Sequence, residues 1–299
     1  MAKSVTMRGI SAPVLTPFYK DGTVNCEEYK RLIRYITTNG VDGVFICGTT
    51  GEFVNLTIRE RKQLLTAAME SVKPETHVLF NTTAMNLEET KELLDWSAKC
   101  GADAVSFTAP YYHKYDQKAL ISYFQKATRL AGELPVYLYN MAGMTHNPIT
   151  PAVLKAVAES CPNLRGIKDS SMDFMVLLNY QCAIEDSSFE IITGNDAQVL
   201  TALQAGAAGG VIAVASVFPA LCAEIWDEFQ KGDLEGARRA QTKVLKLREL
   251  FRAVMPVMSH KKALEMQGFQ MGPARFPFRD LTEEESKRVE QTIHNLGLV

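Results

Sequence analysis

Eight short apolar segments alternate with longer segments of helical periodicity along this chain, and this alternation constrains the fold more than any other feature. Each apolar segment has the length and composition of a β-strand, and the pattern repeats at roughly 25–35 residues. The intervening segments place apolar residues at the i, i+3, i+4 spacing of an amphipathic helix. The predicted strands are Ile10–Leu15, Gly43–Cys47, His77–Asn81, Ala104–Thr108, Val136–Asn140, Arg165–Lys168, Glu190–Thr193 and Gly210–Ala215.

Strands that alternate with helices form a parallel α/β sheet, which is either open and doubly wound or closed into a barrel. Eight such units within about the first 230 residues match a closed barrel better than an open sheet. No Gly-rich dinucleotide-binding fingerprint follows any of the predicted strands, which counts against a Rossmann fold. We therefore predict a (β/α)8 barrel, the TIM barrel, over residues 1–230.

After the eighth predicted strand only helical patterns remain. Residues 219–265 and 282–297 have helical periodicity, and turn signals occur at Gly268 and in residues 272–277. We predict that residues 231–299 form a C-terminal helical region packed on the barrel. Its charged residues are expected to form a solvated face, and they include Arg238, Arg239, Lys243, Lys246, Arg248 and Glu249.

Composition argues against several classes of function. A net charge of -2 provides no attraction to nucleic acid or to an anionic membrane. No stretch approaches the ~18 consecutive apolar residues of a membrane span, and the segment Met1–Arg8 lacks the apolar core of a signal peptide. The six cysteines contain no CxxC pair, and the histidines show no metal-ligand spacing. These features predict a cytoplasmic enzyme that needs no metal.

Lys168 is the most informative single residue. It ends a short apolar segment that is typical of a buried strand, and Asp169 follows it directly. Burying an ammonium group is costly, so a buried lysine tends to lose its proton. A neutral amine in an apolar pocket can attack a ketone and form a Schiff base. Alternatively, Lys168 could extend to the sheet edge or pair with Asp169.

Two further positions follow the ends of predicted strands, where reactive groups of such barrels lie. The loop Gly48-Thr49-Thr50-Gly51-Glu52 comes directly after the second strand, and its hydroxyls and backbone N–H groups could hold a small carboxylate. Tyr139 ends the fifth strand. Taken alone, the loop could be a simple turn and Tyr139 a packed aromatic side chain. Their joint occurrence with Lys168 favours a reactive site.

Motifs along essentially the whole chain resemble the dihydrodipicolinate synthase/N-acetylneuraminate lyase family of class I pyruvate-dependent aldolases. Several of them occur in the family's order, which makes the resemblance specific. It implies a TIM barrel with a C-terminal helical region, usually assembled as a homotetramer from a pair of dimers. The motifs are Pro13–Phe18, the GTTGE loop, Ala109–Tyr112, Tyr139-Asn140, Gly166-Ile167-Lys168 and Gly209–Ile212.

The resemblance also implies roles for individual residues. Lys168 would form the Schiff base with pyruvate, so that no separate cofactor is needed. Tyr139 would move protons at the imine and at the aldol oxygen, and Thr49 would pass them on. Tyr112 is similar to a tyrosine that family members lend to the active site of the adjacent subunit.

Binding of the keto acid is implied at a second set of positions. Gly48 and Thr50, with the neighbouring backbone amides, would hold the pyruvate carboxylate. Gly194 and Ile212 match positions that make backbone contacts near the bound keto acid.

The chain departs from the best-known members of the family. Where their synthases carry an arginine that binds the carboxylate of an amino-aldehyde, this chain has Met144, which cannot form that ion pair. Where sialic acid lyases show a pair of acids, it has Asp196 followed by Ala197, and Ala213 replaces a serine. Asp196 could still accept a substrate hydroxyl or cap the next helix.

We therefore expect a Schiff-base aldolase that makes or breaks a carbon–carbon bond between pyruvate and an aldehyde. The segment Lys168-Asp169-Ser170-Ser171 is similar to ketodeoxy-sugar-acid aldolases, which indicates a 2-keto-3-deoxy sugar acid or a related 4-hydroxy-2-oxo acid as substrate. Dihydrodipicolinate synthase, N-acetylneuraminate lyase and a keto-acid dehydratase stay open within the family. A non-catalytic barrel that binds a keto acid is the alternative from another class.

Overall fold

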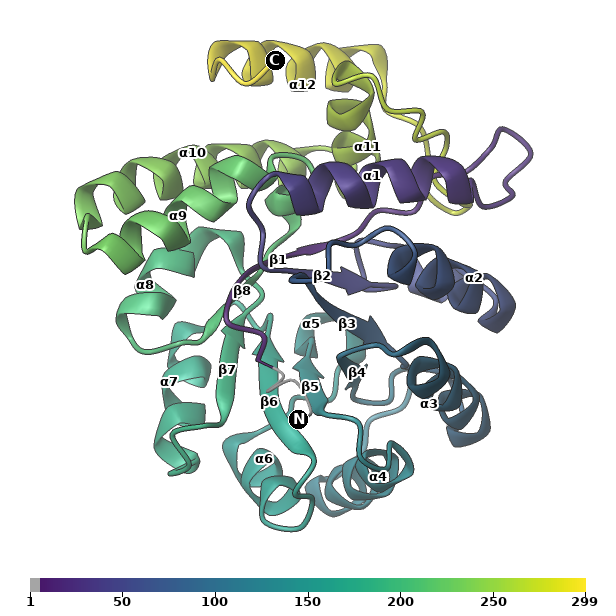
Figure 1. Cartoon of the computed structure of the whole chain (residues 1–299), viewed down its shortest axis with the longest axis vertical. Coiled ribbons are helices and arrows are strands. Elements are labelled where there is room, and N and C mark those ends of the chain that lie inside the picture. Colours follow the sequence, from purple (N-terminus) through teal and green to yellow (C-terminus); the bar gives the residue numbers. More distant parts are fainter. Residues whose placement is uncertain (1–5) are drawn as a thin grey trace.

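The computed structural model describes residues 6–299, and its centre is a closed barrel of eight parallel strands (Figure 1). The strands follow one another around the barrel in sequence order, and β1 pairs with β8 to close it. This confirms the predicted (β/α)8 architecture. The strands are β1 (Gly9–Pro13), β2 (Gly43–Ile46), β3 (His77–Asn81), β4 (Ala104–Thr108), β5 (Val136–Asn140), β6 (Leu164–Asp169), β7 (Glu190–Thr193) and β8 (Gly209–Val211).

Helices surround the strands, and local sequence signals account for several of their boundaries. Thr57 and Glu60 form a capping box at the start of α2, and Thr150 caps α6 with Pro151 at its first position. The helices are α1 (Cys26–Thr38), α2 (Ile58–Met69), α3 (Leu87–Cys100), α4 (Gln117–Leu130), α5 (Ala142–Thr145), α6 (Pro151–Ala158), α7 (Phe174–Ala183), α8 (Val199–Gln204), α9 (Pro219–Lys231), α10 (Leu234–Ala253), α11 (Pro256–Met266) and α12 (Glu283–Asn295), with 3-10 turns η1 (Phe53–Asn55), η2 (Asp196–Gln198) and η3 (Ala213–Ser216).

The eighth strand is shorter than predicted. Instead of continuing to Ala215, β8 ends at Val211 and the chain turns into η3. Backbone N–H groups of Ala215 and Val217 donate to the carbonyls three residues earlier, at 3.2 Å and 3.0 Å. A short run of buried apolar residues suits either a strand or a helical turn, so the pattern alone could not separate the two.

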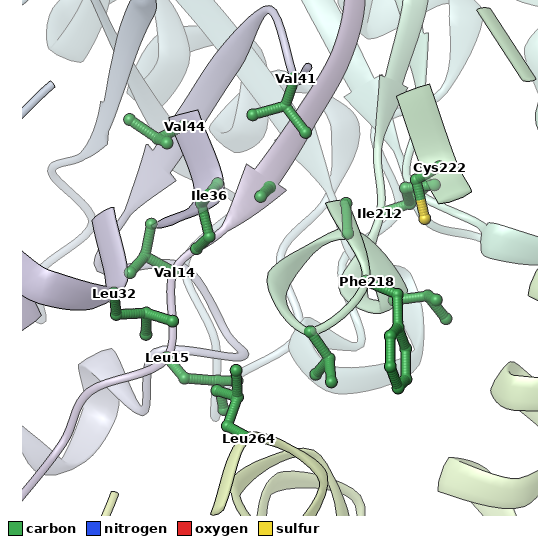
Figure 2. Packing of buried hydrophobic residues seen from close by; sticks show 14 of the residues in the cluster. Val14, Leu15, Leu32, Ile36, Val41, Val44, Ile212, Phe218, Cys222 and Leu264 are labelled. Carbon is green, nitrogen blue, oxygen red and sulfur yellow. The ribbon is translucent and has the colours of Figure 1, made fainter. Parts of the chain in front are cut away.

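The C-terminal helices share a hydrophobic core with the barrel. Helix α10 lies along α9, and α11 and α12 lie beyond α1 at one end of the molecule (Figure 1). Leu264 of α11 lies near Leu15, which follows β1, and both belong to one buried cluster with Leu32 of α1 (Figure 2). A boundary between the barrel and the C-terminal helical region after residue 230 stays a proposal, and the end of α9 at Lys231 supports it.

Two sequence predictions concern the chain ends and membranes. The segment Met1–Arg8, predicted to lack a targeting signal, lies partly outside the described residues, which begin at Thr6. None of the helices within residues 6–299 combines the length and the apolar character that crossing a membrane requires.

Candidate active site

Lys168 lies on β6 with its amine inside the barrel. The residue is 4% exposed, and its Nζ atom lies 4.2 Å from the ring centroid of Tyr139 and 4.5 Å from that of Phe45. Burial lowers the pKa of the Lys168 ammonium group, while the Tyr139 hydroxyl and Asp196 act in the opposite direction. The net effect raises the fraction of neutral amine, which is the nucleophilic form.

The two alternative interpretations of Lys168 do not match its surroundings. The side chain does not extend to solvent, because the residue is almost fully buried. The neighbouring Asp169 carboxylate accepts hydrogen bonds from Asn140 Nδ2 and Ser171 Oγ, both at 2.7 Å. Within residues 6–299 no ion pair joins Asp169 to Lys168. The lysine is therefore buried without a carboxylate partner, as a reactive amine would be.

Three residues predicted for the chemistry come together at this point. Tyr139 and Lys168 are paired neighbours on β5 and β6. Thr49 follows β2, and its Oγ1 lies 3.3 Å from the Tyr139 hydroxyl oxygen, at which distance either group could donate. A chain of two hydroxyls thus begins beside the buried amine.

The GTTGE loop folds tightly because it lies against the backbone of the first strand. A Cβ atom at Gly51 would lie 2.7 Å from the carbonyl oxygen of Val14, so only glycine fits there. The Gly51 N–H donates to the Gly48 carbonyl at 3.1 Å, which closes the turn around Thr49 and Thr50. The loop therefore forms a tight turn, and its part in binding a carboxylate stays a prediction.

Gly194 follows β7 and leaves room for the Lys168 side chain. A Cβ atom at position 194 would lie 2.9 Å from Lys168 Cε and would overlap Ser170 Oγ. The Gly194 N–H donates to the Asp169 carbonyl at 2.6 Å, which fixes the backbone beside the lysine. This glycine was predicted for the site, and its position explains why a side chain is excluded there.

Replacing Gly194 with alanine is expected to displace the lysine amine and to reduce turnover about 100-fold, because small misplacements of reacting groups are costly. Steady-state kinetics and circular dichroism would separate lost activity from lost structure. Gly143→Ala is the matched control, since a Cβ atom there meets nothing within 4 Å. Equal activity of the two variants would contradict this interpretation of Gly194.

A cavity of about 300 Å³ lies beside these groups. Its barrel side is formed by loops that follow the strands, with Thr49, Thr50, Met144, Gly194 and Asp196 among the lining residues. A larger groove of about 570 Å³ lies between the outer helices α1, α2 and α3, away from the carboxyl ends of the strands. The cavity beside the lysine is therefore the candidate substrate site.

Asp196 was predicted either to accept a substrate hydroxyl or to cap the next helix. It does not cap that helix, so the second alternative is wrong. Asn195 is the cap, accepting a hydrogen bond from the Ala197 N–H at 3.1 Å. The Asp196 carboxylate instead accepts from the Val214 N–H at 2.8 Å. Burial raises the pKa of Asp196. Its location in the cavity lining keeps the other alternative, a hydroxyl acceptor, as a prediction.

Five predicted site residues are not among those that line the cavity within this single chain: Lys168, Tyr139, Gly48, Tyr112 and Ile212. Tyr112 is 83% exposed and adopts a left-handed φ of 81°, with its ring against His113. Ile212 is fully buried, and its N–H donates to the Ser11 carbonyl at 3.2 Å. The following residues, Ala213 and Val214, contribute to the cavity instead. Contacts of Tyr112 and Ile212 with a substrate stay predictions.

The opposite wall of the cavity was missed by sequence reasoning. It comes from α10 and α11 and includes Arg248, Phe251, Arg252 and His260. The prediction of a solvated face is wrong for Arg248, whose side chain is only 11% exposed. Burial lowers the pKa of His260 to about 4, so this histidine is neutral near pH 7. Because Arg252 is exposed, the i, i+3, i+4 spacing of positions 248, 251 and 252 gives no local signal that Arg248 is buried.

A buried ion pair beneath the GTTGE loop was also missed. Glu52 ends the loop with a left-handed φ of 60°, and its Oε1 lies 3.0 Å from Lys261 Nζ of α11. Both side chains are 0% exposed. The Arg275 N–H donates to Glu52 Oε2 at 2.9 Å, and Lys261 donates to the Pro273 carbonyl at 2.9 Å. The C-terminal region thus anchors the loop.

Fold and site together define a (β/α)8 barrel with a buried lysine beside a cavity formed by the loops that follow the strands. Comparison with known proteins agrees with this class. The profile of the dihydrodipicolinate synthetase family matches residues 6–296. The chain belongs to this family, and it is a class I aldolase or lyase.

Individual relatives cover almost the whole chain. A 4-hydroxy-tetrahydrodipicolinate synthase of Methanoculleus marisnigri is 33% identical, covering 97% of this chain and 99% of its own. An uncharacterised DapA-like lyase of Halobacterium salinarum is 32% identical, covering 98% of this chain and 95% of its own. One similar solved structure is that of YagE, a prophage protein of this family from E. coli K12, in complex with pyruvate. It superposes with a TM-score of 0.94 at 28% identity, covering 99% of this chain and 100% of its own.

Proposed function

We propose that Lys168 forms a Schiff base with pyruvate and that the enzyme makes or breaks the bond between pyruvate and an aldehyde. The observation that carries this proposal is the buried Lys168 amine, which lies near two aromatic rings and forms no ion pair with a carboxylate of residues 6–299. Supporting it, the similar protein YagE has been solved with pyruvate. No separate cofactor is needed, because the imine itself accepts the electrons.

The chemistry proceeds through an imine and an enamine. The Lys168 amine adds to the pyruvate carbonyl, and loss of water from the adduct gives a protonated imine. The imine then withdraws electrons, so a proton leaves the methyl carbon and the enamine forms. This carbon attacks the aldehyde, whose oxygen takes up a proton, and hydrolysis frees the lysine. Cleavage is the same sequence in reverse.

Hydroxyl groups near the amine are suited to the proton transfers. Tyr139 contacts Thr49 at 3.3 Å, so a proton taken by one hydroxyl can pass to the other. Thr50 lines the cavity, and we propose that it holds the pyruvate carboxylate with the loop backbone at Gly48. Asp196 would accept a hydroxyl of the bound substrate.

Tyr112 would complete this relay from an adjacent subunit of a homotetramer. Its support is its location: a large aromatic side chain that is 83% exposed in the single chain, in a strained backbone conformation. An aromatic residue exposed in this way is suited to a contact between subunits.

The substrate that we propose is a 2-keto-3-deoxy sugar acid or a related 4-hydroxy-2-oxo acid. Met144 lines the cavity and is 60% exposed, so the carboxylate-binding arginine of the family's synthases has no counterpart at this position. The relatives named 4-hydroxy-tetrahydrodipicolinate synthase make that activity the second candidate. Comparing pyruvate release from keto acids with pyruvate consumption in the presence of the amino-aldehyde would separate the two activities.

Borohydride trapping tests the proposal directly. Intact-protein mass spectrometry after incubation with pyruvate and borohydride should show one pyruvate-derived adduct, and peptide analysis should locate it at Lys168. An adduct at a different lysine would refute the assignment. A complete lack of adduct with pyruvate would favour a barrel that binds another keto acid.

Replacing Tyr139 with phenylalanine should slow turnover by about 100-fold or more, because removal of a positioned acid or base typically has this effect. Trapping should still detect some imine, since Lys168 keeps its aromatic surroundings. The measurement is a comparison of kcat with the rate of adduct formation. Wild-type kcat in this variant would remove Tyr139 from the proton relay.

A further inference from the structure

Two arginines of α10 line the same cavity as the loops around Lys168. Arg248 and Arg252 are one helical turn apart, so their side chains leave the same face of the helix. The cavity extends from Thr50 and Gly194 on the barrel side to this wall. Gly194, where a Cβ atom would lie 2.9 Å from Lys168 Cε, lines the same cavity as the arginines, so a ligand attached to the lysine can occupy the space that they border.

Both guanidinium groups contact one sulfur atom. Met172 Sδ lies 2.9 Å from a terminal nitrogen of Arg252 and 3.8 Å from one of Arg248. A thioether is a weak acceptor and a poor partner for two cations. Met172 lies in the loop after Lys168 and adopts a left-handed φ of 66°, which is unfavourable for a residue with a side chain.

The positive charge of this pair is only partly compensated. Arg248 pairs with Glu249 and donates from Nε to Asn195 Oδ1 at 3.2 Å. Arg252 is exposed, and its only polar partner among residues 6–299 is the Met172 sulfur. Arg248 also interacts electrostatically with Asp196, whereas Arg252 has no carboxylate partner among residues 6–299. The charge of Arg252 is therefore available to attract an anion.

Other arginines of the same helix show what an ordinary surface position looks like. Arg238 pairs with Glu235 at 2.7 Å, and Arg239 lies 3.9 Å from both Asp233 and Glu235. Both are exposed, and neither lines the cavity. The arginines at 248 and 252 therefore differ from them in both location and partners.

We propose that Arg248 and Arg252 form an oxyanion-binding subsite for the far end of the 2-oxo acid, so that the substrate carries a second acidic group, a carboxylate or a phosphate. This inference rests on the proposed function, because it assumes a keto acid bound to Lys168. Arginine binds both groups through paired, charge-assisted hydrogen bonds. Met141, Met144 and Phe251 line the cavity as well, which suits a short carbon chain between the two ends.

The test uses chain-matched 2-oxo acids with different far ends. Half-saturation concentrations for borohydride trapping are measured for 2-oxohexanoate, for 2-oxoadipate and for the analogue with a terminal phosphate. Pyruvate serves as the reference ligand. The proteins are the wild type, Arg252→Gln, and Arg239→Gln as the control on the same helix. Arg252 is chosen because its exposed side chain leaves the fold intact when shortened.

In the wild type we expect 2-oxoadipate or the analogue with a terminal phosphate to bind about tenfold more tightly than 2-oxohexanoate, whose far end is a methyl group. Arg252→Gln should lose that advantage, measured as the ratio of the half-saturation concentrations for the methyl end and the acidic end, whereas Arg239→Gln should keep it. A tenfold change corresponds to about 1.4 kcal/mol. Whichever acid responds identifies the carboxylate or the phosphate as the ligand.

Two results would overturn parts of this account separately. The subsite would be refuted if the wild type had equal half-saturation concentrations for all three 2-oxo acids. It would also be refuted if Arg252→Gln weakened the binding of 2-oxohexanoate as much as that of the acids with an acidic far end. Both results would leave the Schiff base in place. A lack of any adduct with pyruvate or the longer acids would refute the proposed function and the subsite together.

Discussion

Lys168→Ala is expected to reduce turnover to background, a loss of about 10⁴-fold or more, because among residues 6–299 no lysine other than Lys168 lies at the cavity. Pyruvate trapping should likewise show no adduct. The fold should persist, because removing the buried amine also removes its desolvation cost, which offsets packing lost beside Tyr139 and Phe45. Kinetics, mass spectrometry and thermal unfolding measure the three effects.

The matched control for this prediction is Lys246→Ala, which removes an exposed lysine of α10. Because burial lowers the pKa of Lys168, adduct formation in the wild type should persist below the ordinary lysine range. It should then decline as the pH falls through that lowered pKa, since only the neutral amine attacks. Pyruvate release by Lys168→Ala at a rate above background would contradict the mechanism.

Glu52→Gln is expected to destabilise the protein by about 3–5 kcal/mol, because it leaves the Lys261 ammonium buried without its partner. The Tyr139–Thr49 pair should also be disturbed, since Glu52 ends the same loop. The measurement is the thermal unfolding midpoint at fixed protein concentration, together with kcat.

The double variant Glu52→Gln/Lys261→Met is the control for the buried pair. Replacing both charges with groups of similar size should recover most of the lost stability, because neither charge remains to be desolvated. If the double variant is as unstable as Glu52→Gln, the contribution of Glu52 comes from another contact, such as the Arg275 N–H.

Much of the barrel could be predicted because its strands are short, apolar and separated by strongly periodic helices. His77–Asn81, Ala104–Thr108, Val136–Asn140 and Glu190–Thr193 begin and end as predicted. The eighth segment differs because its small apolar residues suit a buried turn as well as a strand. The hydrogen bond from the Val214 N–H to Asp196, a residue 18 positions earlier, helps to hold the turn, and a local pattern does not report it.

The candidate site also has one part that the sequence could predict and one part that it could not. Lys168, Tyr139 and Thr49 could be brought together from sequence because each follows or ends a strand, and barrel topology makes such positions neighbours. Arg248 and Lys261 could not, because their charge is typical of a solvated helix. They are buried by packing against loops about 75 to 210 residues earlier in the chain, which local periodicity does not report.

The Glu52–Lys261 pair also bears on how the protein is made. Glu52 is synthesised early, yet Lys261 and Arg275, which satisfy its carboxylate, emerge from the ribosome among the last residues. Until then the GTTGE loop lacks the contacts that anchor it. A nascent chain therefore gains these contacts only near the end of translation, and a chain terminated after the eighth strand would lack them.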